Sequence, residues 1–410
     1  MILPKVCYLS TGIMDTAFDS QVFPLLESAL KSQFNLIHFA FNPFRFKTTE
    51  RYLKKKEELG SKGIKTYYFQ QAPPIFKRSL IMDVKRIHPF LKSWWGGEER
   101  VVIHCRGHLN AYRGLTLKRE SRNLITIIAD LRGAVTDEVM DRSRGVARNL
   151  FAQYLSKLYQ RIEDQVVRNA ETILCVSNAF KAHLQTNYRI KNVIVIPTFV
   201  DVSQFNFNKA LRDLHRKKIG ISNRTVLVYS GGVAPWQKLE NVVNLFVNLK
   251  QIVNNLFMLF LTHEPNLLMK VIKGQIQPDD VRVIQVPHAE VAGYLCAADV
   301  GVLLREDTLT NHVAAPIKFS EYMCCGLPCI VSDKVGDTAE VIRKEKAGIV
   351  LEGLRETPKS PEFQKLLVLN REEISNRMSK RYASSLYIPE ILKLYRTLAE
   401  KRPPFSLDAC

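Results

Sequence analysis

The sequence predicts an α/β protein with two doubly wound domains, and two observations lead to that prediction. Short apolar runs alternate with helical patterns along most of the chain, which is typical of parallel strands joined by crossover helices. At 410 residues, the chain is also too long to fold around a single ordinary core. Hydrophobic residues make up 46% of it and charged residues 24%, which are the values of a folded globular protein.

The first half of the chain has the pattern of a parallel sheet with its crossover helices. We expect strands at residues 5–10, 36–39, 64–69, 100–104, 124–129, 172–176 and 192–196. Helical patterns lie between them, near residues 18–33, 50–59, 109–120, 146–169 and 178–187. Because strands and helices alternate, this half is expected to form one Rossmann-like domain.

The second half repeats the pattern after a polar, irregular and basic stretch at residues 197–223, which we interpret as a linker. We expect strands at residues 225–229, 256–261, 281–286, 300–304, 328–332 and 348–351. Helices are expected near residues 239–254, 289–298, 316–325 and 338–346. A second Rossmann-like domain follows from this alternation.

The formal net charge of +19 predicts an acidic partner or surface. Basic residues are concentrated in segment 45–95, where an apolar stripe at helical spacing is followed by two tryptophans. The stripe is Phe76, Leu80, Val84, Ile87 and Leu91, and the cations beside it are Lys77, Arg78, Lys85 and Arg86. A basic amphipathic helix of this kind is typical of docking on an anionic membrane, which we favour. A domain helix with a solvated basic face remains the alternative, and nucleic acid is not the expected partner.

Cysteine usage and the lengths of the apolar runs indicate a cytoplasmic protein. The eight cysteines form no Cys-x-x-Cys pair, so we expect buried free thiols instead of disulfides or a zinc site. Residues 1–8 have the pattern of a first strand and not of a signal peptide. No apolar run reaches the roughly 20 residues that span a bilayer. The protein is expected to be soluble or peripherally attached to a membrane.

Ligand-binding residues are expected where strands end, because such domains bind ligands at the carboxyl ends of their strands. In the first half, Gly12 follows the first strand and would allow close backbone approach to a ligand, although a plain turn explains it equally well. Asp130 and Arg132 follow a later strand. They would orient a hydroxylated acceptor, balance a phosphate or form a structural ion pair, and the sequence leaves these alternatives open.

Two loops in the second half are suited to a diphosphate. Gly231 and Gly232 permit close backbone approach, and Lys238 follows them at the start of a helix. Lys318 and Glu321 lie three residues apart on one face of another expected helix, which follows a short apolar strand and a loop. A carboxylate can accept hydrogen bonds from ribose hydroxyls, so the two loops together indicate a nucleoside diphosphate ligand.

These motifs resemble those of retaining GT-B glycosyltransferases of family 4 (glycosyl transferases group 1), especially the bacterial surface-polysaccharide type. The matching segments are residues 130–138, 176–177, 196–205, 231–238, 286–300 and 316–328. The resemblance implies two facing Rossmann-like domains with a C-terminal helix that crosses back onto the first. The acceptor-side domain is then expected at residues 1–203, with a helix at about 386–410, and the donor domain at residues 204–385.

The resemblance also implies the reaction and its site residues. A sugar would move from a nucleoside diphosphate-sugar to a glycan or lipid-linked acceptor in cell-surface polysaccharide assembly, with no metal and no further cofactor. The enzyme would attach peripherally to the inner face of the cell membrane. The implied catalytic residues are Asp130, Arg132 and Lys238. The implied donor-binding residues are Gly12, Gly231, Gly232, Lys238, Val286, Pro287, His288, Asn311, Ala314, Ala315, Pro316, Ile317, Lys318 and Glu321.

One position departs from the family pattern and leaves the sugar open. The family usually carries Glu-x7-Glu, whose second Glu maps onto Glu321 and whose first maps onto Val313. The candidates for replacing that first carboxylate are Asn311, Glu306 and the backbone N–H groups of Ala314 and Ala315. Three alternatives to a transferase remain: a GT-B sugar-nucleotide epimerase, a catalytically inactive nucleotide-binding scaffold of the same fold, and a nucleic-acid-binding protein.

Overall fold

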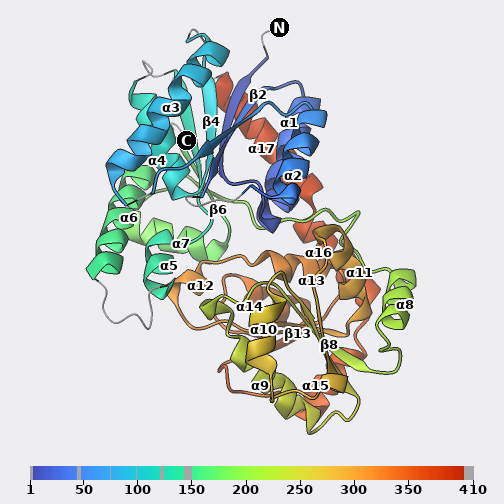
Figure 1. The fold of residues 1–410 in the computed structure, drawn as a ribbon. Helices are drawn as coiled ribbons and strands as arrows, with labels where there is room; N and C mark the ends of the chain where they lie inside the picture. Colours follow the sequence, from blue (N-terminus) through green and yellow to red (C-terminus); the bar gives the residue numbers. More distant parts are fainter. Residues whose placement is uncertain are drawn as a thin grey trace, which may run out of the picture. The chain divides into compact units, whose positions relative to one another are not determined.

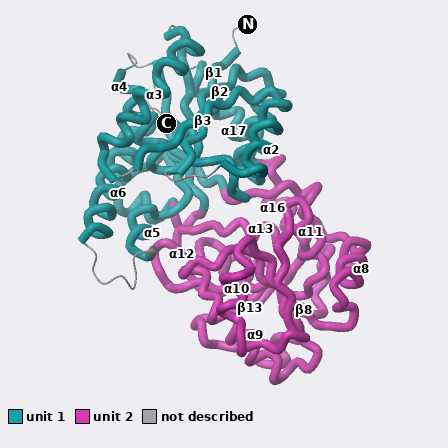
Figure 2. Tube along the Cα trace, viewed as in Figure 1, with its two compact units in different colours: residues 1–176, 181–196, 387–410 teal, residues 177–180, 197–386 magenta. Residues whose placement is uncertain are grey.

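The computed structural model describes residues 3–43, 48–73, 75–97, 99–120, 124–142 and 150–400, the side chain of residue 142 excepted. The chain forms two compact units (Figure 2). Unit 1 comprises residues 1–176, 181–196 and 387–410, and unit 2 comprises residues 177–180 and 197–386. Each unit is built around a parallel sheet flanked by helices, which confirms the predicted α/β fold.

Unit 1 contains a seven-stranded parallel sheet in the order β3-β2-β1-β4-β5-β6-β7 (Figure 1). Its strands are β1 (Lys5–Thr11), β2 (Asn35–Asn42), β3 (Thr66–Gln70), β4 (Val101–Arg106), β5 (Ile125–Asp130), β6 (Thr172–Cys175) and β7 (Val193–Val195). The central strands are buried on both faces, as their almost continuous apolar runs require. The chain reverses its direction of winding beside β1, so ligand-binding residues are expected at the carboxyl ends of β1 and β4.

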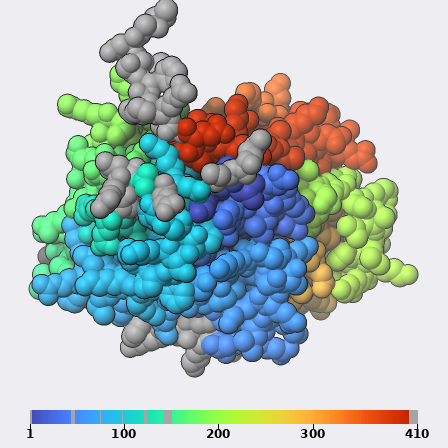
Figure 3. Space-filling model, turned by 90° about the horizontal axis from the view of Figure 1, so that it is seen from above, coloured from blue at the N-terminus to red at the C-terminus, as the bar shows by residue number. Residues whose placement is uncertain are grey.

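Helices cover both faces of this sheet. On one face, α3 (Lys77–Trp95), α4 (His108–Arg119) and α6 (Leu150–Asn169) pack together, and α1 (Phe23–Lys31) lies on the other (Figure 1). Within unit 1, the C-terminal helix α17 (Ser384–Ala399) places Tyr395 Oη 2.7 Å from His104 Nδ1 and the Tyr395 ring edge-on to Phe34. The red C-terminal segment accordingly lies beside blue N-terminal residues in the space-filling view (Figure 3). The other helical elements are a π-helical turn (Phe18–Val22), α2 (Glu50–Ser61), α5 (Val135–Arg142) and α7 (Asn178–Tyr188).

Helix α3 carries the amphipathic stripe that the sequence offers as a membrane-docking face. Leu80, Val84, Ile87 and Leu91 are at most 2% exposed, so most of the stripe packs into the core of unit 1. The expectation that this apolar face enters a membrane is therefore wrong, and α3 is a domain helix with a solvated basic face. Within the basic segment 45–95, residues 45–47 and 74 lie outside the described residues.

Unit 2 contains a six-stranded parallel sheet in the order β10-β9-β8-β11-β12-β13. Its strands are β8 (Thr225–Ser230), β9 (Leu256–Leu261), β10 (Val281–Ile284), β11 (Val300–Leu303), β12 (Cys329–Ser332) and β13 (Gly348–Leu351). Its helices are α8 (Lys209–Lys218), α9 (Leu239–Lys250), α10 (Pro265–Ile272), α11 (His288–Ala297), α12 (Leu309–His312), α13 (Ile317–Cys324), α14 (Thr338–Glu345), α15 (Ser360–Leu367) and α16 (Arg371–Tyr382), with short 3₁₀ turns at Pro235–Gln237 and Pro278–Asp280. The strand order reverses between β8 and β11, which marks their carboxyl ends as the ligand-binding edge.

Part of the stretch predicted to be a linker is a helix of unit 2. Helix α8 begins after Asn208, whose side chain accepts a hydrogen bond from Leu211 N. Arg212 and Arg216 on this helix form ion pairs with Asp299 at 2.5 and 3.3 Å. The prediction of an irregular linker over residues 197–223 is wrong for α8. Its arginines pack against the rest of unit 2 through Asp299 and do not face solvent as linker side chains would.

The described residues contain free thiols and no cluster suited to a metal. All seven cysteines in the described ranges are buried and free, which confirms that expectation for them, and Cys410 lies outside those ranges. In the same part of the chain, no group of three or more His, Cys, Asp or Glu side chains is placed to hold a metal ion. Among the described helices, none has the length and apolar character needed to cross a bilayer.

Candidate functional site

The donor-binding candidates of unit 2 gather at the carboxyl edge of its sheet. The loop that follows β8 contains Gly231, Gly232 and Lys238, and the segment that follows β11 leads into α13 with Lys318 and Glu321. Because β8 and β11 are adjacent and parallel, both loops leave the sheet at the same edge. The two predicted loops therefore lie together at this edge, and their joint role as a site stays a prediction.

The Lys318 ammonium is buried at the centre of this edge. Its Nζ atom donates a hydrogen bond to Gln237 Oε1 at 3.0 Å and lies 4.0 Å from the centroid of the Tyr229 ring. Among the described residues, no carboxylate lies within ion-pair distance of it. Burial lowers the pKa of Lys318 well below its ordinary value, the Arg305 guanidinium lowers that pKa further, and the Glu321 carboxylate opposes the shift. A buried cation with neutral contacts is suited to an anionic ligand.

Gly231 leaves room for that ammonium. It adopts φ of +141°, and a Cβ atom at this position would lie 2.6 Å from Lys318 Nζ. Around the same loop, Tyr229 Oη lies 2.7 Å from Gly232 O, and Ser230 N donates to Tyr322 Oη at 2.6 Å. The phenol hydroxyl groups therefore hold the glycine loop in place while its backbone stays open to a close approach.

Glu321 is paired with the histidine that the resemblance assigns to the base-binding loop. His288 Nε2 lies 3.0 Å from Glu321 Oε1, and Glu321 is 3% exposed. His288 opens α11 directly after Pro287, its N-cap residue, and its ring packs against Phe205 at 5.3 Å between centroids. This contact brings the loop at Val286, Pro287 and His288 to the predicted ribose-binding carboxylate.

Lys238 is also drawn into an ion pair. It adopts a left-handed conformation at the N-cap of α9, and its Nζ atom lies 3.1 Å from Glu306 Oε2. The expected phosphate-binding lysine and one candidate for the missing sugar carboxylate therefore neutralise each other. Both side chains are about one-third exposed, so a ligand can reach the pair.

Sequence reasoning missed Arg305 in this site. Arg305 follows β11 almost directly, and its Nη1 atom donates to Asn311 Oδ1 at 3.2 Å. Its backbone N and O bond to the hydroxyl group of Ser332, which fixes it at the edge of the sheet. A charged residue directly after a buried apolar strand was the available signal.

Asn311 is placed as a buried loop residue and not as an exposed sugar ligand. It is fully buried, and its side-chain amide donates to Glu306 O at 2.9 Å. The backbone N–H of Ala314 bonds to Asn311 O at 3.2 Å, which leaves the N–H of Ala315 as the better placed of the two predicted backbone donors. Val313 is 1% exposed, so its side chain offers nothing to a sugar.

Pro316 and Ile317 start α13 where the sequence places a helix opening. Pro316 is the N-cap residue and makes no side-chain capping bond, so the first amide groups of α13 have no capping side chain. Gly336 abuts this segment, since a Cβ atom there would lie 1.8 Å from Ala314 O. The turn before α13 is therefore packed too tightly to accept a larger residue at position 336.

In unit 1, Asp130 lies at the end of β5 and is the centre of a buried charge cluster. Its carboxylate accepts hydrogen bonds from Arg106 Nη1 at 3.2 Å and Arg132 Nη1 at 3.1 Å, and His104 Nε2 lies 3.5 Å away. Burial alone would raise the pKa of Asp130, but Arg132, His104 and Arg106 together hold it below its usual range. Both guanidinium groups also contact Gln21 Oε1. The geometry favours the structural ion-pair interpretation for the carboxylate itself.

Gly12 has a conformational reason for being glycine. Its φ is +70°, a left-handed conformation, and its N–H donates to Phe41 O at 2.8 Å. It belongs to unit 1, whereas the other predicted donor-binding residues belong to unit 2. The plain-turn explanation accounts for it.

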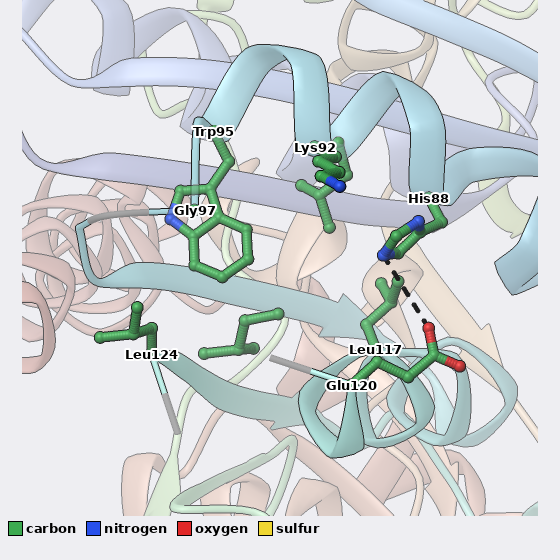
Figure 4. Close-up of a pocket in the computed structure, with 9 residues that line it drawn as sticks. His88, Lys92, Trp95, Gly97, Leu117, Glu120 and Leu124 are labelled. Carbon is green, nitrogen blue, oxygen red and sulfur yellow. Dashed lines mark ion pairs between the residues drawn. The ribbon is translucent and has the colours of Figure 1, made fainter. Parts of the chain in front are cut away.

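A cavity of about 350 Å³ opens in unit 1 beside the last turns of α3 and the starts of the strands (Figure 4). Its lining includes the Trp95 indole, Leu117 and Leu124, and the His88–Glu120 pair lies at one side with 3.9 Å between Nε2 and Oε2. Ile125 begins β5 whereas Asp130 ends it, so this cavity lies toward the opposite edge of the sheet from the charge cluster. It is not part of the predicted site.

Comparisons with known proteins cover most of the chain. Residues 212–382 match the family model described as glycosyl transferases group 1, and residues 68–204 match the model described as Glycosyltransferase Family 4. A search of curated proteins finds no match.

Solved structures similar to this chain have the same fold. Sucrose-phosphate synthase from Thermosynechococcus elongatus is 14% identical over 96% of this chain and 98% of its own, with a TM-score of 0.71. Anabaena HepE, solved in complex with UDP and glucose, is 13% identical over 96% and 99%, with a TM-score of 0.69. WaaG, a glycosyltransferase involved in lipopolysaccharide biosynthesis, is 12% identical over 97% and 100%, with a TM-score of 0.62. At these identities, the similarity shows the fold alone.

Proposed function

The chain belongs to the glycosyl transferases of group 1, family 4, with the GT-B fold, and from that premise we propose a specific reaction. A sugar is transferred from a nucleoside diphosphate-sugar to a glycan or lipid-linked acceptor with retention of anomeric configuration. The observation that carries the donor class is the buried Lys318 ammonium beneath the glycine loop, which has neutral contacts and a pKa lowered by burial. HepE binds UDP and UDP-glucose, which supports a nucleotide donor here.

The proposed chemistry places the departing diphosphate at Lys318. The bond between the anomeric carbon and the diphosphate oxygen breaks, and the acceptor hydroxyl oxygen bonds to that carbon on the same face. The hydroxyl proton passes to a diphosphate oxygen, so no side-chain nucleophile and no metal take part. Lys318, with Lys238 and the glycine-loop N–H groups, stabilises the negative charge that develops on the leaving group.

The remaining candidates take supporting roles in this proposal. Glu321 holds the ribose hydroxyls, and the backbone at Val286–His288 holds the base. In unit 1, we propose that Arg106 and Arg132 contact the acceptor, because their side chains are 15% and 18% exposed at the strand ends whereas the Asp130 carboxylate is 5% exposed. We further propose that the acceptor belongs to cell-surface polysaccharide assembly at the inner face of the cell membrane.

The donor class is tested with a panel of nucleoside diphosphate-sugars. We expect one nucleoside diphosphate-sugar of the panel to be hydrolysed slowly when no acceptor is present and to transfer its sugar faster when acceptors are added. NMR should show the same anomeric configuration in the donor and in the product. An inverted anomer would reject the retaining mechanism. Epimerised donor without any acceptor would support the epimerase, and absence of nucleotide binding would support the inactive scaffold.

Glu321→Gln tests the ribose contact separately from the diphosphate contact. We expect the affinity for the nucleoside diphosphate to fall about tenfold, which corresponds to one hydrogen bond to a charged group. The affinity for inorganic diphosphate should stay unchanged, because that ligand has no ribose. Isothermal titration calorimetry with both ligands measures this difference. Equal losses for both would show that Glu321 acts through its charge, which favours the protonated Lys318, and not by binding ribose.

A further inference from the structure

A hollow of about 600 Å³ opens in unit 1 between the start of α3 and the first half of α6, and its lining contains none of the residues assigned above. We call it the basic hollow. Its lining consists of Phe76, Lys77, Arg78, Tyr154, Lys157, Leu158 and Arg161. The two contributing segments are nearly 80 residues apart in the sequence, so only the fold brings them together.

The lining has one sign of charge. It includes four cationic side chains, Lys77, Arg78, Lys157 and Arg161, and no carboxylate. In the described part of the chain, none of the four forms an ion pair with an acidic side chain. Elsewhere in unit 1, exposed lysines such as Lys54 and Lys62 are paired with Glu50 and Glu27. The basic hollow is therefore a concentrated, uncompensated part of the +19 net charge.

Exposed apolar side chains surround these cations. Phe76 is 57% exposed and Tyr154 is 42% exposed, and their rings meet at 6.1 Å between centroids. On α6, which carries Tyr154, Leu150 and Phe151 are 81% and 48% exposed. Leu150, Tyr154 and Arg161 share one face of α6 because they are spaced by four and seven residues. Large apolar groups beside unpaired cations are the pattern of a surface that meets lipid headgroups.

The start of α3 adds to the attraction for an anion. Phe76 is its N-cap residue and makes no side-chain capping bond, and the first turn contains no acidic residue. The N-terminal amide groups of this 19-residue helix therefore lack a capping side chain, next to Lys77 and Arg78.

We propose that the basic hollow docks unit 1 on a membrane by binding the phosphate headgroups of anionic phospholipid. The four cations contact phosphate, and Phe76 and Tyr154 lie at the level of the glycerol and upper acyl groups. This surface replaces the buried stripe of α3 as the membrane contact. A membrane is favoured over nucleic acid because the exposed Leu150 and Phe151 have no role on a polyphosphate backbone. The inference deepens the proposed function by naming the surface, and it rests on that function only for the location of the acceptor.

Co-sedimentation with vesicles tests the proposal on the full chain. We expect the wild type to bind phosphatidylcholine vesicles that contain phosphatidylglycerol and to ignore vesicles of phosphatidylcholine alone, with binding that weakens as salt rises. The double variant Lys157→Gln/Arg161→Gln should bind about 30-fold more weakly, because each cation near an anionic surface contributes roughly a fivefold factor. Phe76→Ala/Tyr154→Ala should also weaken binding at constant charge.

A matched control removes the same charge from another basic surface of unit 1. Lys85 and Lys92 are exposed on α3 outside the basic hollow, so Lys85→Gln/Lys92→Gln should change vesicle affinity less than about threefold. Equal losses of vesicle affinity in the two charge-removing variants, Lys157→Gln/Arg161→Gln and Lys85→Gln/Lys92→Gln, would overturn the proposal in favour of a diffuse electrostatic attraction. Competition by inorganic phosphate at low concentration would identify a free anion as the ligand instead, and tight RNA or DNA binding lost in the same variant would identify nucleic acid.

Nucleotide binding by the same variants separates this inference from the proposed function. All three double variants lie in unit 1 and should keep the wild-type affinity for the nucleoside diphosphate. A wild type that binds the nucleoside diphosphate but does not prefer phosphatidylglycerol vesicles would reject the basic hollow as a membrane contact and leave the transferase proposal standing. A wild type that binds phosphatidylglycerol vesicles specifically but binds no nucleotide would reject the transferase proposal and leave the basic hollow standing.

Discussion

Lys318→Met is expected to raise the free energy of unfolding of the ligand-free protein while abolishing nucleoside diphosphate binding. The wild-type ammonium is buried with one neutral hydrogen-bond acceptor and one aromatic face, so folding carries a desolvation cost. Replacement of buried ion pairs by apolar side chains of similar volume is often stabilising, by up to about 4 kcal/mol, and we expect the same direction for this single charge. The loss of a buried charge partner lowers the affinity for the nucleoside diphosphate by about 100-fold or more. Thermal unfolding with and without nucleotide measures both effects.

An exposed lysine of the same unit supplies the control. Lys270 lies on α10 and is exposed, so Lys270→Met should change both stability and affinity very little. If Lys318→Met were destabilising and left nucleotide affinity unchanged, Lys318 would be a structural residue and the diphosphate site would lie elsewhere.

The lowered pKa of Lys318 fixes the direction of the pH dependence. Between that lowered pKa and the ordinary value of 10.5, the unfolded chain binds more protons than the folded one. The stability of the ligand-free wild type should therefore rise with pH through this range, and Lys318→Met should lack that rise. A bound diphosphate favours the charged ammonium, so binding takes up a proton and affinity falls as pH increases. Calorimetry in two buffers of different ionisation enthalpy measures that uptake.

Much of the fold follows from the sequence because strand and helix periods differ so clearly. The apolar runs at residues 225–229, 300–304 and 328–332 predict three of the strands of unit 2, and parallel strands place the following loops at one edge. That rule was enough to associate the glycine loop with Lys318 and Glu321. That rule could not predict that Lys318 lies directly beneath Gly231, because the contact depends on the path of a loop nearly 90 residues earlier in the chain.

The predictions that failed have a common physical cause. Polar composition does not distinguish a side chain that faces solvent from one whose polar atoms bind protein groups, as Arg216 in α8 does through Asp299 and the carbonyl of Ala297. Periodicity likewise shows that α3 has an apolar face but not whether that face meets the core or a membrane. Both distinctions require tertiary contacts, and so does the basic hollow, which is assembled from Phe76 and Tyr154.

The two charge centres of this protein are built on opposite principles. In unit 2, Lys318 is left without a carboxylate partner among the described residues, so its burial cost is relieved only when an anion arrives. In unit 1, the Asp130 carboxylate is matched by two guanidinium groups of the protein itself. A site that must bind a charged ligand retains an uncompensated charge, whereas a site that positions cations pairs them in advance. Substitutions at the two centres should therefore change stability in opposite directions.

Asp130→Ala is expected to lower the free energy of unfolding of unit 1 by about 3–5 kcal/mol, because it leaves Arg106 and Arg132 without their buried carboxylate. The pKa of Asp130 is lowered in the folded state, so its contribution is complete above the unfolded value near 3.9 and is lost as pH falls toward the folded value. The difference in free energy of unfolding between wild type and variant should accordingly become smaller below about pH 4. Differential scanning calorimetry across pH measures it.

Nucleotide binding shows whether this loss is confined to unit 1. At a temperature where the variant is folded, its affinity for the nucleoside diphosphate should equal that of the wild type, while sugar transfer is lost because the arginines are displaced. Asp213→Ala, which removes an exposed carboxylate paired with Lys209 in unit 2, is the control and should change stability little. A variant that stays as stable as the wild type yet transfers no sugar would instead assign Asp130 a direct chemical role. That result would restore the acceptor-orienting alternative that the sequence left open.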